Sequence, residues 1–108
     1  LVDRVVVSRP VRGYVVDLVM ATRDPYGYGI DIGSLIEHAA SPRATIGLTL
    51  AAKATAFLAG RSYVTPQDVK AIAADVLRHR ILLSYEAEAD GVTTGAIVRR
   101  LLDHVPVP

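Results

Sequence analysis

The segment Ser41-Pro42-Arg43-Ala44 has residue types that could bind an anion, because it places a cation at the start of a predicted helix. Ser41 is a typical N-cap, since its hydroxyl can accept a hydrogen bond from a backbone N–H left unpaired there. Pro42 suits the first helical position, where its missing N–H costs nothing. Arg43 is unusual, because the helix dipole disfavours a cation at this end by a few tenths to about 1 kcal/mol. A phosphate would offset that cost, since helix N-termini bind phosphates and arginine binds them through its fork of donors.

A second interpretation of Arg43 stays open from the residues alone. An arginine in a predicted surface turn can also lie in solvent, or pair with a nearby carboxylate such as Glu37. Taken by itself, the segment slightly favours this second interpretation over a phosphate contact.

The other reactive side chains form no recognisable catalytic or metal-binding group. Three carboxylates in residues 86–90 alternate with alanines and predict an exposed strand or turn rather than an acid–base pair. His38, His79 and His104 lie far apart without metal-ligand spacing, so we expect surface or capping roles and no metal site. The chain has no phosphate-binding loop, dinucleotide fingerprint or nucleophile elbow. By itself it is therefore predicted to hold no catalytic residue.

The densest basic cluster is Arg78-His79-Arg80, at the end of a predicted helix. Cations at this position complement the negative end of the helix dipole, which is the simpler interpretation. A contact with another domain or subunit is the alternative, and the sequence does not assign the three residues a role.

Composition limits the classes of protein that remain. With 108 residues, of which 51% are apolar, the chain predicts one folded domain with a modest core. Its net charge of +1 argues against broad binding to nucleic acid or anionic membranes. The absence of cysteine excludes disulfides, thiol catalysis and zinc–thiolate sites, and fits a cytoplasmic location. No apolar run approaches the roughly 18 residues of a membrane span.

Two amphipathic helices are predicted on either side of a loop region. The first follows Ser8 and stops at Asp24-Pro25, because a residue before proline avoids the helical region. The second runs from Pro42 to about Leu58, and Gly60 can supply the left-handed residue that ends it. Apolar residues at helical spacing predict the buried faces: Val11, Tyr14, Val15, Leu18 and Val19 in the first, and Ile46, Leu50, Ala54, Phe57 and Leu58 in the second.

Two further helices are predicted in the second half of the chain. Thr65-Pro66-Gln67-Asp68 has the cap, proline and acid of a helix start, and Thr93 caps the last helix. Their predicted buried residues are Val69, Ile72, Ala73, Val76 and Leu77, then Ile97, Val98, Leu101 and Leu102.

The remaining segments are short. Residues 26–29 predict a loop, and Ile32 to Ala39 an extra turn of helix. Val5 to Val7 and Ile81 to Tyr85 are expected to be extended and to pair with each other. The sequence therefore predicts a mainly α fold: a compact bundle of four main helices with a minor short β element.

These features together resemble the C-terminal lid domain of MoxR-type AAA+ ATPases, over nearly the whole chain and in the right order. One departure is Ala39, where the family more often has glycine. The chain also begins with Leu1 rather than methionine, so residues 1–108 are expected to be a single lid domain from a longer ATPase. The matching segments are Tyr14 to Val19, Ala21-Thr22-Arg23, Ala40 to Ala44, Gly60 to Val69, Val76 to Arg80, Tyr85 to Glu88 and Val105 to Pro108.

The resemblance implies a role for Arg43. In AAA+ proteins the lid carries an arginine, called sensor 2, at the start of a helix, where it reaches the γ-phosphate of ATP bound on the preceding ATPase domain. By this likeness Arg43 is the ATP-binding residue, Ser41 supports it as the helix cap, and Mg²⁺ is held by the ATPase domain. With the resemblance included, a phosphate contact becomes the favoured interpretation of Arg43 over a solvated or ion-paired arginine. The chemistry is consistent with this, because a forked cation can stabilise charge during phosphoryl transfer.

The resemblance also implies partners. The family forms chaperone-like rings of identical subunits, often with von Willebrand factor A-type proteins, and each lid packs on its own upstream ATPase domain. The client protein cannot be read from these residues. The alternatives are a stand-alone helical nucleic-acid-binding module and a protein-interaction bundle. Against the first, the connection Gly60–Pro66 is long for a helix–turn–helix, and the next helix offers only Lys70 as a base reader.

Overall fold

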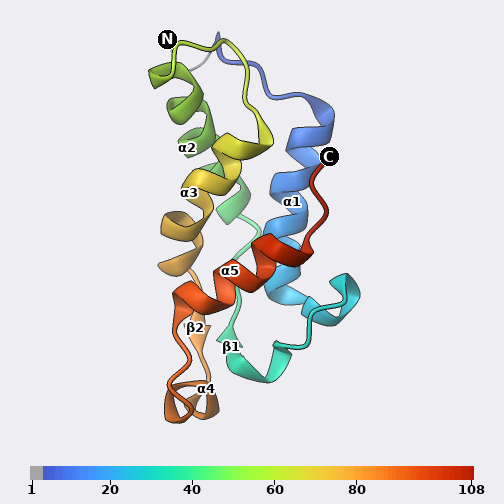
Figure 1. Ribbon diagram of the computed structural model, residues 1–108, viewed down its shortest axis with the longest axis vertical. Helices are drawn as coiled ribbons and strands as arrows, with labels where there is room; N and C mark the ends of the chain where they lie inside the picture. The colour runs from blue at the N-terminus through green and yellow to red at the C-terminus, as the bar shows by residue number, and fades with distance from the viewer. Residues whose placement is uncertain (1–3) are drawn as a thin grey trace.

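The computed structural model describes residues 4–108 and is mainly helical, with one two-stranded antiparallel sheet (Figure 1). The predicted fold class, four main helices with a minor β element, is confirmed. In chain order the elements are α1 (Arg9–Arg23), the 3₁₀ turns η2 (Pro25–Tyr28) and η3 (Gly33–Leu35), β1 (Ile36–His38), α2 (Ala44–Leu58), α3 (Pro66–Arg78), β2 (Leu82–Leu83), α4 (Tyr85–Ala89) and α5 (Thr94–His104).

Three of the four main helices begin at the cap that the sequence predicted. Ser8, Thr65 and Thr93 each accept, through the side-chain hydroxyl, a backbone N–H from three residues ahead. Thr65 and Asp68 complete a reciprocal capping box, which satisfies two donors at the start of α3. The predicted apolar stripes of α1, α3 and α5 also face the interior, being buried or half-buried throughout.

The start of α2 differs from its prediction. The helix begins at Ala44, two residues later than expected, and Arg43 rather than Ser41 occupies the N-cap position. Arg43 has a helical backbone there, with φ −64° and ψ −18°. The end of α2 is as predicted, because Gly60 adopts φ 79° and the N–H of Arg61 closes on the carbonyl of Ala56.

The predicted buried face of α2 was wrong. Its buried residues are Ala44, Leu48, Ala52 and Ala56, whereas Ile46, Leu50, Phe57 and Leu58 are exposed and Ala54 is half-buried. The cause is that α2 is apolar nearly all round, so its periodicity does not select a face. Three of the four buried residues are alanines, which allow α3 to pack closely against the helix.

The pairing of the extended segments was also wrong. β2 pairs with β1, joining Leu83 to Ile36 across an irregular register, while Val6 makes an isolated parallel bridge to Tyr63. The expected helical turn over Ile32 to Ala39 is confirmed only for η3, since the strand β1 follows it. The expected acidic strand or turn is instead the short helix α4, which Ser84 caps.

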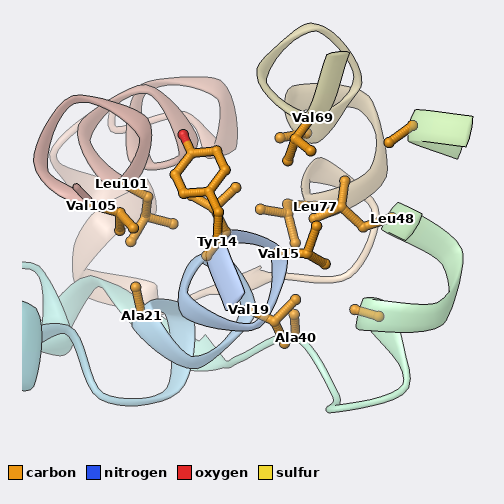
Figure 2. Packing of buried hydrophobic residues seen from close by; sticks show 14 of the residues in the cluster. Tyr14, Val15, Val19, Ala21, Ala40, Leu48, Val69, Leu77, Leu101 and Val105 are labelled. Atoms are coloured by element: carbon orange, nitrogen blue, oxygen red, sulfur yellow. The ribbon is translucent and has the colours of Figure 1, made fainter. Parts of the chain in front are cut away.

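The molecule is elongated, with extents of 44 × 22 × 21 Å, and α4 lies at one end of the long axis (Figure 1). α3 packs against α2 and α5, and α1 contacts all three of these helices. Figure 2 shows the centre of the core, where Tyr14 and Val15 of α1 lie among side chains from α2, α3 and α5. This core holds the end of α1 beside the start of α2, where the anion-binding candidate lies.

Candidate functional site

Arg43 lies exposed in a tight turn that leads into α2. The Ser41 hydroxyl accepts the Arg43 N–H at 3.1 Å, and the Ser41 carbonyl accepts the Ala44 N–H at 2.8 Å. Ser41 therefore shapes the turn that presents Arg43, although it does not cap the helix in the way the sequence predicted. Pro42 is exposed beside it and prevents any further backbone donor at that point.

The anion-binding capacity of this turn rests on the Arg43 side chain. The first N–H groups of α2 are already engaged, because Thr45 and Ile46 donate to the carbonyls of Pro42 and Arg43 at 3.1 and 3.0 Å. This departs from the sequence argument, which relied on unpaired N–H groups at the helix start. The remaining attraction for a phosphate is the guanidinium fork, together with the positive end of the helix dipole.

No ion pair engages Arg43 within residues 4–108, so the pairing with Glu37 considered from the sequence is not found. Its guanidinium is an exposed cation on a defined backbone. Such a group can bind an anion brought to it by another domain or molecule, and removing it leaves no buried partner unsatisfied.

The segment before Arg43 is fixed to the end of α1. The Thr22 hydroxyl accepts the Ala40 N–H at 3.2 Å, and the Arg23 guanidinium donates to the Ala40 carbonyl at 3.3 Å. Ala40 is fully buried, and Figure 2 draws its side chain close to that of Val19. No local sequence pattern assigned Thr22 or Arg23 a role in positioning Ala40. A signal was present for Thr22, because it continues the apolar stripe of α1, and a buried hydroxyl must find a partner.

An apolar surface adjoins this turn. Val16 and Met20 of α1, with Ile46 and Leu50 of α2, are each 39% to 62% exposed. A shallow hollow of about 380 Å³ between these helices includes Val16, Ile46 and Leu50 in its lining. We call these four residues the α1–α2 apolar surface. Contiguous exposed apolar side chains of this kind mark contact surfaces more often than free ones.

The other candidates are dispersed. Arg78, His79 and Arg80 are exposed, and Arg78 pairs with Asp75 of its own helix at 3.2 Å. The three histidines are exposed as predicted, and a His104 ring nitrogen lies 2.8 Å from the Arg100 carbonyl. Over residues 4–108, no three histidine or carboxylate side chains gather in a way that could hold a metal ion. None of the helices in that range is long and apolar enough to cross a bilayer.

The one buried carboxylate of the described chain, Asp68, belongs to the framework rather than to the turn. Burial alone would raise its pKa, but hydrogen bonds from the Thr65 backbone N–H and the Arg61 guanidinium lower the pKa below its usual value. These bonds join the start of α3 to the segment that follows α2, so they stabilise the scaffold on which α2 rests.

A protein-family model matches about two thirds of the chain. Residues 31–101 match the family described as the AAA lid domain. This range includes the turn with Arg43, all of α2 and α3, and most of α5.

Individual relatives agree with the family match. The chain is 45% identical over 96 residues to Chaperone MoxR1 of Mycobacterium tuberculosis, covering 88% of this chain and 26% of the relative. It is 40% identical over 108 residues to Protein MoxR of Paracoccus denitrificans, covering 94% of this chain and 32% of that relative. A crystal structure from Cytophaga hutchinsonii, described as a candidate ATPase, superposes with a TM-score of 0.95 at 44% identity. The match covers 99% of this chain and 33% of that protein. The chain thus spans about a quarter to a third of the length of these proteins.

Proposed function

The chain belongs to the AAA lid domain family, in the form found in MoxR-type AAA+ ATPases, and from this we propose that it is the lid of a longer ATPase and supplies Arg43 to bound ATP. Arg43 is the sensor-2 residue in this proposal and binds the γ-phosphate. Residues 1–108 then form a single C-terminal lid domain, and the phosphate-binding loop and the Mg²⁺ site belong to the ATPase domain before it.

The observation that carries the proposal is the combination of exposure and fixed placement at Arg43. The side chain is exposed, although its backbone is fixed by the Ser41 turn and by the anchored Ala40. A cation at a helix start gains no folding stability from its position. This arrangement is expected when the cation's partner lies on another domain.

The donor set fits a nucleotide phosphate, since Arg43 is an exposed guanidinium with no ion-pair partner within residues 4–108. ATP supplies the phosphoryl group that is transferred to water. Arg43 binds and orients the terminal phosphate and stabilises the negative charge that spreads over its oxygens. Ser41 holds the Arg43 N–H, so it orients the residue without contacting the phosphate.

The α1–α2 apolar surface supports the proposed contact with an ATPase domain. It begins within one turn of Arg43, and α2 is apolar on both faces, which is typical of a helix covered on both sides. An ATPase domain seated on this surface would bring its nucleotide beside Arg43. Movement of the lid would then depend on whether ATP or ADP is bound, because the γ-phosphate is the group that Arg43 holds.

The wider assignment follows the relatives. One of them is named a chaperone, and we propose that the full-length protein is a cytoplasmic, ring-forming ATPase that remodels other proteins. A von Willebrand factor A-type protein is the proposed partner.

The test is steady-state ATP hydrolysis by the full-length protein that contains this lid. Arg43→Ala should lower turnover, weaken ATP binding, or both, and Arg43→Lys should restore only part of the activity, because a point charge does not reproduce a forked contact. Arg99→Ala, on the exposed face of α5, is the matched control and should leave hydrolysis unchanged. Full activity in Arg43→Ala, with ATP affinity also unchanged, would reject the role.

A further inference from the structure

Thr22 and Arg23, in the last turn of α1, together hold both backbone polar groups of Ala40. The Thr22 hydroxyl donates to the Val19 carbonyl at 2.6 Å and accepts the Ala40 N–H at 3.2 Å. The Arg23 guanidinium donates to the Ala40 carbonyl at 3.3 Å. Within residues 4–108, these are the hydrogen bonds that Ala40 makes.

Hydrogen bonds as well as packing hold this segment. Ala40 is fully buried, whereas the preceding residue, Ala39, is half-buried and lines a hollow of about 460 Å³ together with Thr22 and Arg23. The ladder of β1 ends at His38, so it gives Ala40 no backbone partner. The two hydrogen bonds are thus what ties the backbone at Ala40 to α1, and a buried N–H without a partner is costly.

The segment that follows transmits this placement to Arg43. Only two residues separate Ala40 from Arg43, and the Ser41 hydroxyl and carbonyl hold the turn between them. Because the N–H groups of Arg43 and Ala44 are both engaged, this short turn has little freedom, and the position of Ala40 sets where the guanidinium of Arg43 can reach.

We propose that Thr22 and Arg23 are positioning residues for Arg43 and act on the nucleotide only through it. The inference rests on the proposed function, since it requires that Arg43 binds ATP. A displacement of about 1 Å at a catalytic contact can cost on the order of a hundredfold in rate. Loss of the Ala40 anchor is therefore expected to slow hydrolysis although no group that contacts ATP has been removed.

The first experiment compares Thr22→Val with Thr22→Ser in the full-length ATPase. Valine keeps the shape of threonine but removes the hydroxyl, whereas serine keeps the hydroxyl and loses a methyl group. A positioning role predicts that Thr22→Val loses between about threefold and a hundredfold in kcat, while Thr22→Ser stays within about twofold. A packing role alone predicts the opposite order, and that order would overturn the proposal for Thr22.

The matched control is Thr55→Val in α2. The Thr55 hydroxyl donates to the Ala51 carbonyl at 2.9 Å within its own helix and is half-buried. The substitution thus removes a similar hydroxyl without touching the anchor, and hydrolysis should not change. Should Thr22→Val fail to fold, Arg23→Met removes the other hydrogen bond to Ala40. Arg23 is exposed, and removing an exposed side chain rarely unfolds a protein.

The second experiment repeats Thr22→Val and Arg23→Met in the Arg43→Ala background. If both act through Arg43, neither lowers hydrolysis further once Arg43 is gone, and the coupling energy equals the single-mutant effect. A loss that persists in this background would mean that the residue acts independently of Arg43, which overturns the inference for it. A fully active Arg43→Ala single variant would instead reject the proposed function itself. If Arg43→Ala is slow but Thr22→Val and Arg23→Met are both fully active, only the positioning role of Thr22 and Arg23 is rejected.

Discussion

The starts of α2 and α3 share a sequence signature but differ in structure. Both have a hydroxyl residue followed by proline, Ser41-Pro42 in one and Thr65-Pro66 in the other. At α3 the cap bonds reciprocally with Asp68, three residues on. At α2 the corresponding residue is Ala44, which cannot return the bond, and the chain instead forms a tight turn with Arg43 in the N-cap position.

The two helices also differ in which residues they bury and which they expose. α3 buries its apolar stripe and exposes mainly polar residues, whereas α2 buries three alanines and Leu48 and exposes four large apolar residues. α3 is thus complete within this domain, while α2 presents a cation and apolar side chains to whatever lies outside. We infer that α3 serves stability and that α2 serves a contact. The predictions below test this difference, from the largest expected change in the free energy of unfolding to the smallest.

The same substitution should cost much more stability on the buried face of α2 than on its exposed face. Leu48 is fully buried, so Leu48→Ala should cost about 2 to 5 kcal/mol of stability. Leu50 is 52% exposed, and Leu50→Ala should change stability by less than about 0.5 kcal/mol in the isolated domain. Chemical denaturation of the two variants checks this. Equal losses would mean that the exposed face is needed for folding rather than for contact.

The folding stability that the start of α3 contributes should depend on pH through Asp68. Its lowered pKa means that folding favours the carboxylate, so this stability is fully present above the unfolded pKa of about 4 and is lost as the pH falls below it. Asp68→Asn should cost about 2 kcal/mol at neutral pH, because the hydrogen bonds of the capping box and of the pair with the part-exposed Arg61 lose their charged acceptor. Thermal melts from pH 7 to pH 3 should show a smaller slope for the variant. A slope equal to that of the wild type would place the acid sensitivity elsewhere.

The stability lost on replacing Thr65 or Ser41 by alanine should follow the hydrogen bonds that each hydroxyl makes. Thr65→Ala should cost about 1 kcal/mol through loss of a true N-cap. Ser41→Ala should cost less than about 0.5 kcal/mol, since Ser41 is exposed and accepts only the neighbouring Arg43 N–H. Paired thermal melts of the isolated domain decide the ranking, and a larger loss for Ser41→Ala would contradict our account of the α2 start.

The sequence predicted those parts of the fold that depend on local signals. Caps at Ser8, Thr65 and Thr93 follow from bonds within four residues, and the stripes of α1, α3 and α5 follow from a clear polar face. The buried face of α2 could not be predicted, because the helix is apolar nearly all round and tertiary packing decided that three alanines and Leu48 are buried. The strand pairing and the Thr22–Ala40 bond join residues far apart in sequence, which no local pattern specifies. At the candidate site, the unfavourable placement of Arg43 singled it out as a candidate, which stays a prediction, but the hydrogen bonds from Thr22 and Arg23 to Ala40 were not predicted.

The smallest expected effect on stability is at Arg43 itself. Arg43→Ala should change the free energy of unfolding of the isolated domain by less than about 0.5 kcal/mol, because the side chain is exposed. Arg43→Glu should raise stability by a few tenths to about 1 kcal/mol, since an acid at a helix start is favoured by the dipole, and the gain should shrink as salt is added. Urea denaturation at low and high salt measures both variants, with Arg99→Glu on α5 as the control for charge alone. If Arg43 slightly weakens the isolated domain and Arg43→Ala also slows hydrolysis by the full-length protein, Arg43 serves function rather than folding. A large loss of stability in Arg43→Ala would instead make Arg43 part of the scaffold and remove the contrast between α2 and α3.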